Sequence, residues 1–217
     1  MAVKSQEIVD VALPATASRR QNTKPRAGND QEQRMINAAA QMFYEKGYDA
    51  TSIQDVADKL GLLKGSLYHY IKSKDDLLWA IILRQHQSAL ALAERCRTLS
   101  GTPRERLTAF IEGYVGSLDK EHVFVSVYLH DINRLSADRR RTVTHEREAY
   151  TGFVVDVLSE GRETGEFRAD LDPVLSANAI LGMLNSTYRW YRPGTKFSSK
   201  AIIAECLAII LHGVASD

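Results

Sequence analysis

The chain has few of the residues that would indicate a metal centre, a disulfide framework or a membrane span. Its two cysteines, Cys96 and Cys206, stand alone, with no second cysteine or histidine at ligand spacing, which argues against zinc and disulfides. No apolar run is long enough to span a bilayer, and no signal-peptide pattern is found, so we expect a cytoplasmic protein with no membrane partner. The net charge is only +1, so any contact with nucleic acid must come from a local basic patch.

Residue constellations that would indicate catalysis are also missing. The six histidines show no HExxH or comparable spacing, and no nucleophile with a paired base can be recognised. We therefore expect a protein that is not an enzyme and that needs no cofactor or metal.

Apolar residues follow helical spacing through most of the chain, which predicts an all-α protein. Val123–Leu129 is rich in β-branched and aromatic residues and could pass for a buried strand, but no partner strand is found elsewhere, so we expect helix there. Three short helices in residues 30–72 should form a helix-turn-helix domain, the first capped at Asp30. Residues 73–217 should form a larger helical domain for effector binding and dimerisation, beginning with one long helix.

The most informative stretch is residues 51–78, TSIQDVADKLGLLKGSLYHYIKSKDDLL. Thr51 and Ser52 stand where an N-cap belongs, before a short amphipathic helix that Gly61 ends, because glycine tolerates a left-handed backbone. A second helix follows within three residues. Its apolar face should consist of Leu63, Leu67, Tyr70 and Ile71. Two short helices around a glycine-containing turn are typical of a helix-turn-helix, whose second helix lies in the DNA major groove.

The outer face of that second helix suits contact with DNA. Lys64 can donate to guanine or to phosphate, Ser66 can serve several bases, and Gly65 lets the backbone approach closely. Donors beside them, and the free N–H groups where helices begin, can hold phosphates without reading sequence. The candidate DNA-binding residues are Thr51, Ser52, Leu63, Lys64, Gly65, Ser66, Tyr68, His69, Tyr70 and Lys74. The alternative is a well-capped helical hairpin with a solvated face.

At these residues the chain resembles the tetracycline-repressor (TetR) family of transcriptional regulators. The run from about Met35 to Leu78 contains AAAQMFYEKGYDATSIQDVADKLG, the glycine-serine pair and LYHYIKSKDDLL. The resemblance implies a homodimeric regulator, in most cases a repressor, that binds a palindromic operator in double-stranded DNA. The last helix, apolar around most of its circumference, agrees with a dimer formed by the last two helices.

Residues 1–29 precede the first expected helix and lack periodicity, so we expect a disordered basic extension. It carries SRRQNTKPR, with Arg19, Arg20, Lys24 and Arg26. One hypothesis places this arm in the minor groove or along the phosphates beside the recognition helix. The alternative is a solvated leader with no fixed role.

The larger domain should hold a small-molecule effector whose binding changes the spacing of the two DNA-binding units. Arg189 and Arg192 flank Trp190 and Tyr191, an arrangement that suits phosphates and an adenine ring. The candidate effector-binding residues are Tyr114, Phe124, Tyr128, Asn133, Arg134, Phe153, Asn185, Arg189, Trp190 and Arg192. For most of the aromatic residues, packing in the core is the alternative.

Three further stretches carry a narrower resemblance. SVYLHDINRL, DVLSEGRETGEFRADLD and TYRWYRPG resemble the regulatory domain of repressors of steroid and fatty-acid catabolism that respond to acyl-CoA thioesters. This implies a coenzyme A derivative as effector, with Arg134, Arg189 or Arg192 on its phosphates. Two other functions stay open: an all-helical protein-interaction module, and an acyl-CoA-binding protein without DNA recognition.

Overall fold

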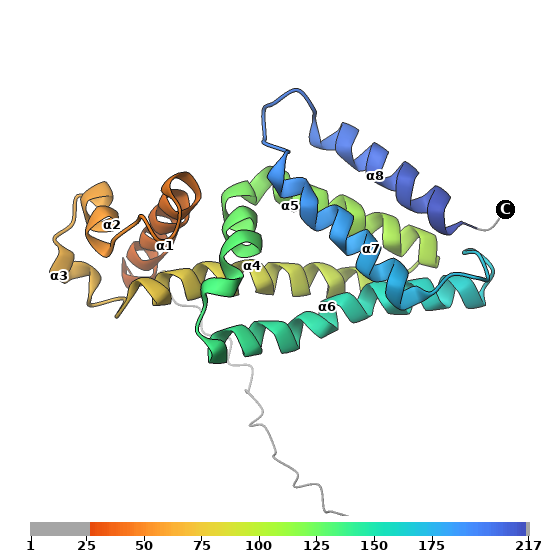
Figure 1. The fold of residues 1–217 in the computed structure, drawn as a ribbon, viewed down its shortest axis with the longest axis horizontal. Coiled ribbons are helices and arrows are strands. Elements are labelled where there is room, and N and C mark those ends of the chain that lie inside the picture. Colours follow the sequence, from red (N-terminus) through yellow and green to blue (C-terminus); the bar gives the residue numbers. More distant parts are fainter. Residues whose placement is uncertain (1–26, 216–217) are drawn as a thin grey trace, which may run out of the picture.

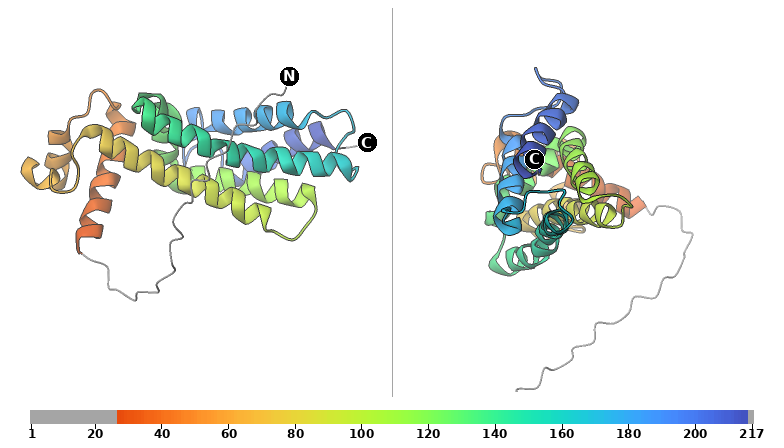
Figure 2. Two further views of the ribbon diagram at one scale, coloured as in Figure 1. Left: turned by 90° about the horizontal axis from the view of Figure 1, so that it is seen from below. Right: turned by 90° about the vertical axis from the view of Figure 1, so that its right-hand side faces the viewer.

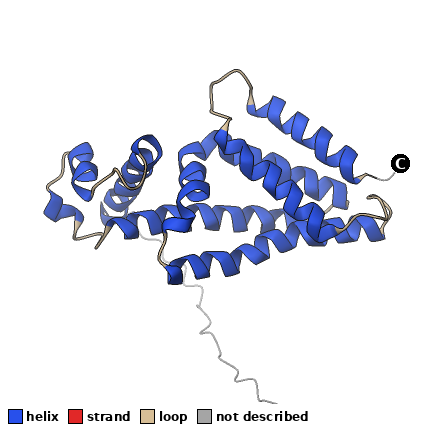
Figure 3. Cartoon of the chain, in the orientation of Figure 1, coloured by secondary structure: helices blue, strands red, loops and turns tan. Residues whose placement is uncertain are grey.

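A computed structural model describes residues 27–215, which are helical through most of their length (Figures 1 and 3). Two 3-10 turns, η1 and η2, span Ile132–Arg134 and Thr187–Arg189. Within the described residues, the β-pairing is a single isolated bridge between Phe167 and Ala215. The all-α prediction is confirmed. The α-helices are α1 Ala27–Lys46, α2 Ile53–Leu60, α3 Lys64–Leu67, α4 Lys74–Arg97, α5 Pro103–Asp131, α6 Ala137–Glu163, α7 Pro173–Ser186 and α8 Ser199–Val214.

The helices form two groups joined by α4. We call residues 27–72, with α1 to α3, the head, and residues 98–215, with α5 to α8, the body. Figure 1 shows the head at one end of the molecule, and Figure 2 shows α4 running from it along the body. Helix α4 has 24 residues, so it is roughly 36 Å long at 1.5 Å per residue. The expected single long helix is therefore present.

The local signals at the start of α2 act as expected. Ser52 is the N-cap, and it forms a reciprocal capping box with Asp55. Gly61 ends the helix with a φ of 65°, in the left-handed region.

Two local expectations in the head are wrong. Helix α1 begins at Ala27, so Asp30 lies inside its first turn and is not its cap, and the remainder of the predicted basic extension, residues 1–26, lies outside the described residues. Helix α3 is a single turn, so Leu63 precedes it as the N-cap and is 81% exposed. Tyr70 is also exposed, whereas Leu67 and Ile71 are buried as predicted. The predicted apolar face assumed a helix from Leu63 to Ile71, but α3 spans only Lys64–Leu67, so Leu63 and Tyr70 lie outside it.

Helix α5 bends at Glu121, whose φ of −127° and ψ of 33° are not helical (Figure 1). The bend divides the helix between two hydrophobic clusters. Leu118 packs in the core of the body, whereas Phe124 and Val127 pack in the core of the head. The ambiguous stretch Val123–Leu129 is helical, as predicted, because a helix pairs its own backbone groups.

The core of the head is continuous with the rest of the molecule. Leu67 and Ile71 belong to one cluster with Leu77 of α4 and with Val143 of α6. The predicted boundary at residue 72 is therefore not marked by a gap in packing, and movement of α4 must carry the head with it. No helix among residues 27–215 has the length and apolarity needed to cross a membrane.

Candidate DNA-binding face and effector cavity

The second helix of the helix-turn-helix presents its polar side chains outward. Lys64, Tyr68 and His69 are exposed, and Ser66 is half-buried, because Leu67 anchors the single turn of α3 in the core. Leu63, Gly65 and Tyr70 are exposed beside them. The side chains of Lys64 and His69 and the phenols of Tyr68 and Tyr70 thus lie on one exposed surface, and Gly65 leaves the start of α3 without a side chain. Such a surface can contact base edges and phosphates.

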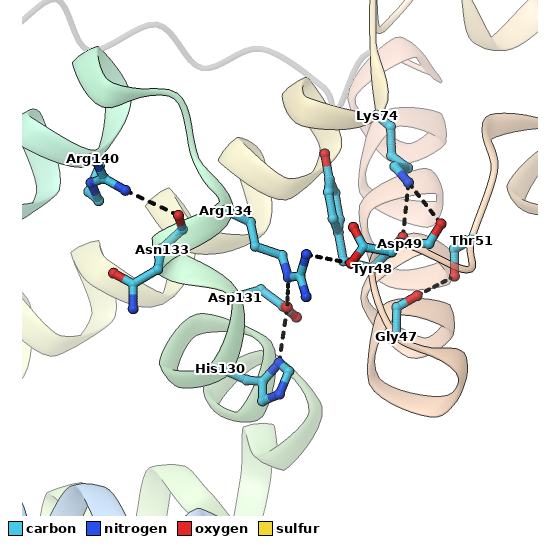
Figure 4. Close-up of polar contacts among 10 residues, drawn as sticks. All are labelled: Gly47, Tyr48, Asp49, Thr51, Lys74, His130, Asp131, Asn133, Arg134 and Arg140. Carbon is cyan, nitrogen blue, oxygen red and sulfur yellow. Dashed lines mark hydrogen bonds and ion pairs between the residues drawn. The ribbon is translucent and has the colours of Figure 1, made fainter.

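Two of the predicted DNA-binding residues have partners inside the protein. Thr51 is buried, and its hydroxyl donates to the carbonyl oxygen of Gly47 at 2.9 Å. The Lys74 ammonium donates to the carbonyl oxygen of Tyr48 at 2.9 Å and lies 4.3 Å from the centre of that ring (Figure 4). Both side chains hold the turn between α1 and α2. Ser52 is exposed, but its hydroxyl is engaged with Asp55.

Replacing Lys64 by alanine is expected to weaken operator binding and also to change the preferred base sequence. Replacing Tyr68 by alanine should weaken binding to all duplexes alike, because a phenol can hold a phosphate without reading a base. Binding to a library of randomised duplexes at two salt concentrations separates the two effects. If the Lys64→Ala variant selected the same sequences as the unaltered protein, Lys64 would not be a base-reading residue.

The body contains a cavity of about 470 Å³ between α4 and α5, which extends to α6 and α7. Its buried wall includes Gln85 and His86 of α4 and Tyr114 of α5. Exposed members of its lining include Arg95 and Lys120, and among the described residues neither cation forms an ion pair. Glu112 is exposed in the same lining, and Glu121 is paired with Arg84. The cavity thus combines a buried wall of mixed polarity with an excess of positive charge at its opening.

Three of the ten predicted effector-binding residues line this cavity: Tyr114, Tyr128 and Asn185. The other seven, Phe124, Asn133, Arg134, Phe153, Arg189, Trp190 and Arg192, do not. The sequence analysis missed the lining residues that α4 contributes, because it named no effector-binding candidate on that helix. A signal was present: Gln85 and His86 interrupt a buried stripe that also includes Ile81, Ile82 and Leu92.

The aromatic candidates outside the cavity are core residues. Phe153 packs against Phe110 with ring centres 5.4 Å apart. Phe124 lies under the guanidinium of Arg84, 4.0 Å from its carbon, in the core of the head. Phe153 and Phe124 therefore pack in the core and do not line the cavity.

The basic candidates near the end of α7 point elsewhere. Arg192 donates to the carbonyl oxygens of Tyr188 and Tyr191 at 2.6 and 2.8 Å, and its guanidinium lies 5.7 Å from the ring centre of Tyr44 in α1. Arg189 lies over the ring of Tyr188, and Trp190 is exposed. Arg192 therefore joins the segment after α7 to the head, and these residues do not surround one site for coenzyme phosphates.

Arg134 lies at the junction between head and body (Figure 4). Its guanidinium contacts Asp49, in the turn after α1, and lies 3.2 Å from the carboxylate of Asp131, which is buried at the end of α5. Asp131 also lies 3.0 Å from the ring nitrogen of His130. Arg134 thus holds the head to the body, a role that the sequence analysis had not considered. Asn133 contributes only its backbone carbonyl, which accepts from Arg140 at 3.1 Å.

A second junction contact surrounds His122, just after the bend in α5. Its Nε2 lies 3.2 Å from the hydroxyl of Tyr44 in α1 and 3.3 Å from that of Ser126. Burial lowers the pKa of this imidazole, and the charge of Arg192 lowers that pKa further. The folded protein therefore favours the neutral ring, so that acid should weaken the contact.

We expect the melting temperature to fall as the pH drops from about 7.5 to about 5.5, through the ordinary histidine pKa of about 6.5. Because the folded-state pKa of His122 is lowered, the unfolded chain binds more protons in this range, so stability is lost as the pH decreases. The melting temperature of the His122→Gln variant should fall less over the same pH range. His145→Gln, at an exposed position, is the control. Equal pH dependence in all three proteins would contradict the assignment.

Comparison with known proteins agrees with this arrangement. Residues 35–81 match the family model described as bacterial regulatory proteins, tetR family. Residues 100–214 match the model described as tetracyclin repressor-like, C-terminal domain. The chain therefore belongs to the TetR family of DNA-binding transcriptional regulators, which are not enzymes.

Individual relatives place the chain more closely. It is 30% identical to the transcriptional repressor KstR2 of Mycobacterium tuberculosis over 87% of this chain and 95% of that one. The solved structure of that protein, described as a ketosteroid transcriptional regulator, covers 87% of this chain and 97% of its own, with a TM-score of 0.82. PfmR of Thermus thermophilus is 33% identical over 82% of this chain and 97% of its own, with a TM-score of 0.77.

One further structure shares the fold. AibR, solved in complex with isovaleryl coenzyme A and operator DNA, is 24% identical and covers 82% of this chain and 97% of its own, with a TM-score of 0.76. At that identity the likeness extends to the fold alone.

Proposed function

We propose that this protein is a dimeric transcriptional repressor that leaves its operator when a coenzyme A thioester binds in the cavity between α4 and α5. The observation that carries the proposal is the position of this cavity against α4, the helix that continues into the head. An effector that fits the cavity better in one position of α4 than in another shifts the spacing of the two heads. A repressor with this role acts on the chromosome, so we place it in the cytoplasm.

Exposed apolar side chains on the last two long helices support dimerisation. Leu175 of α7 is 70% exposed and Ile209 of α8 is 55% exposed, with Val174 beside the first. Large exposed apolar side chains on two helices are what a protein interface would cover. A twofold dimer would present two α3 helices to a palindromic operator, whose half-sites lie roughly 34 to 36 Å apart.

The opening of the cavity supports an anionic effector. Arg95 and Lys120 are exposed there, and neither forms an ion pair with a described residue. The phosphate groups of a coenzyme A thioester would bind Arg95 and Lys120 outside the cavity, while its acyl group would lie inside the cavity. AibR, which has the same fold, was solved with isovaleryl coenzyme A and operator DNA, as noted above. Arg134 and Arg192, which the sequence suggested as phosphate partners, have partners at the head-to-body junction.

A gel-shift titration tests the proposal. The purified protein is titrated against the DNA upstream of its own gene, then challenged with saturated acyl-CoA thioesters of increasing length and with the matching free acids. Release by thioesters and not by acids is the expected result. DNA binding that no thioester weakens would contradict the effector while leaving the DNA-binding function intact.

A further inference from the structure

The lining of the cavity that we assign to the effector includes a buried amide whose oxygen accepts no hydrogen bond from a described residue. The side-chain oxygen Oε1 of Gln85 has no hydrogen-bond partner among the described residues, and the residue is only 5% exposed. Gln85 lines the cavity from α4, at the level where α5 bends. A buried amide oxygen without a partner costs free energy, so its place in the lining of a cavity calls for a ligand group that satisfies it.

Two hydrogen bonds join other polar side chains of the buried wall to each other. The hydroxyl of Tyr114 donates to Oδ1 of Asn185 at 2.7 Å, which links α5 to α7. The Nδ1 of His86 lies 3.4 Å from the hydroxyl of Tyr128. Gln85 lines the same wall, and its side-chain oxygen takes part in no such link between helices.

From this we infer that the effector carries a neutral oxygen function, a hydroxyl or a ring or chain carbonyl, that enters the cavity and hydrogen-bonds to the amide of Gln85. This inference rests on the proposed function of the cavity and narrows the class of acyl group that it selects. A hydroxyl donates to Oε1, and a carbonyl accepts from Nε2 if the amide is rotated, so either group satisfies a buried amide. A plain alkyl chain satisfies neither atom.

The charges of the lining fix the direction in which such a ligand enters. Arg95 lies ten residues beyond Gln85 on α4, about 15 Å along the helix at 1.5 Å per residue. With Lys120 it places two positive charges at the exposed part of the lining, against the one negative charge of Glu112, which is also exposed there. An anionic coenzyme part therefore stays outside, and the oxygen function lies at the inner end of the acyl group.

The preference should be measurable, because a site built around a hydrogen bond discriminates strongly against a ligand that lacks it. Leaving the amide unsatisfied should lower affinity about tenfold or more. Isothermal titration calorimetry of the full-length protein would compare decanoyl-CoA with decanoyl-CoA carrying a mid-chain or terminal hydroxyl or oxo group. We expect at least one oxygenated thioester to bind about tenfold more tightly than the plain one.

Two leucine substitutions on α4 distinguish the effect of losing the Gln85 amide from the effect of placing a leucine on this helix. Gln85→Leu should remove the preference and bind plain decanoyl-CoA at least as well as the unaltered protein does. Gln87→Leu, at an exposed position outside the lining, should keep the preference. Equal binding of plain and oxygenated thioesters by the unaltered protein, or an unchanged preference in Gln85→Leu, would overturn the inference.

A second pair of probes separates this inference from the proposed effector class. Decanol and the α,ω-diol of the same length carry no coenzyme, so they test the buried wall alone. A preference for the diol that disappears in Gln85→Leu supports the inference even if no thioester binds, in which case only the coenzyme assignment is wrong. Equal binding of the two alcohols, with no thioester binding, overturns both.

Discussion

Replacing Ile209 by glutamate is expected to give a monomer and to lower affinity for a palindromic operator at least about a hundredfold. Ile209 is 55% exposed on α8, where we place the dimer interface. In a twofold interface the substitution occurs on both protomers, so two unpaired carboxylates would have to leave water together. Each tenfold loss corresponds to about 1.4 kcal/mol, so a hundredfold loss needs less than 3 kcal/mol.

Light scattering after size-exclusion chromatography would report the mass, and gel shift would report operator affinity. Leu99→Glu is the matched control, because Leu99 is also an exposed apolar residue but lies beyond the end of α4. It should leave both measurements unchanged. An Ile209→Glu protein that remains dimeric would show that α8 does not form the interface.

Replacing Arg134 by methionine is expected to lower operator affinity about tenfold while the helix content stays the same. The guanidinium joins Asp49 in the head to the buried Asp131 in the body, and methionine keeps the length of the side chain without its charge. Without this contact the head samples more orientations, so that fewer molecules hold both recognition helices at operator spacing. The free energy of unfolding should fall by about 1–3 kcal/mol, because Asp131 loses a partner.

Two comparisons test this assignment. Arg140→Met is the matched control, since Arg140 donates to the backbone of Asn133, close by in the same segment. This variant should bind operator normally. Asp49→Asn should weaken binding as Arg134→Met does, and the double variant should be little worse than either single one. Fully additive losses would show that the two residues act independently.

The fold could be predicted well from local patterns. Ser52 with Asp55, Thr102 before Pro103, and Asp172 before Pro173 each mark the start of a helix, and each does cap one in the structure. These signals are local because the cap and the N–H groups that it accepts lie within three residues of each other. The bend at Glu121 has no comparable signal, since neither proline nor glycine stands there.

The site was harder to predict, because side chains were assigned by chemical type alone. Arg134 and Arg192 were assigned to coenzyme phosphates, but their partners come from the head, in Asp49 and Tyr44. Gln85 was not among the candidates, although it lines the cavity. Each partner lies tens of residues away along the chain, so spacing within a helix carries no information about it.

The sequence by itself determined the all-helical class, the caps of α2, α5 and α7 and the outward polar face of α3, because all of these follow from interactions between residues three or four apart. Only the tertiary structure decided which buried polar groups have partners and which face a cavity. That outcome depends on how α4, α5, α6 and α7 meet, and packing at such a meeting is set by the shapes of many side chains at once. The sequence around an arginine or a glutamine does not show whether its side chain joins two domains, as that of Arg134 does, or lines a cavity, as that of Gln85 does.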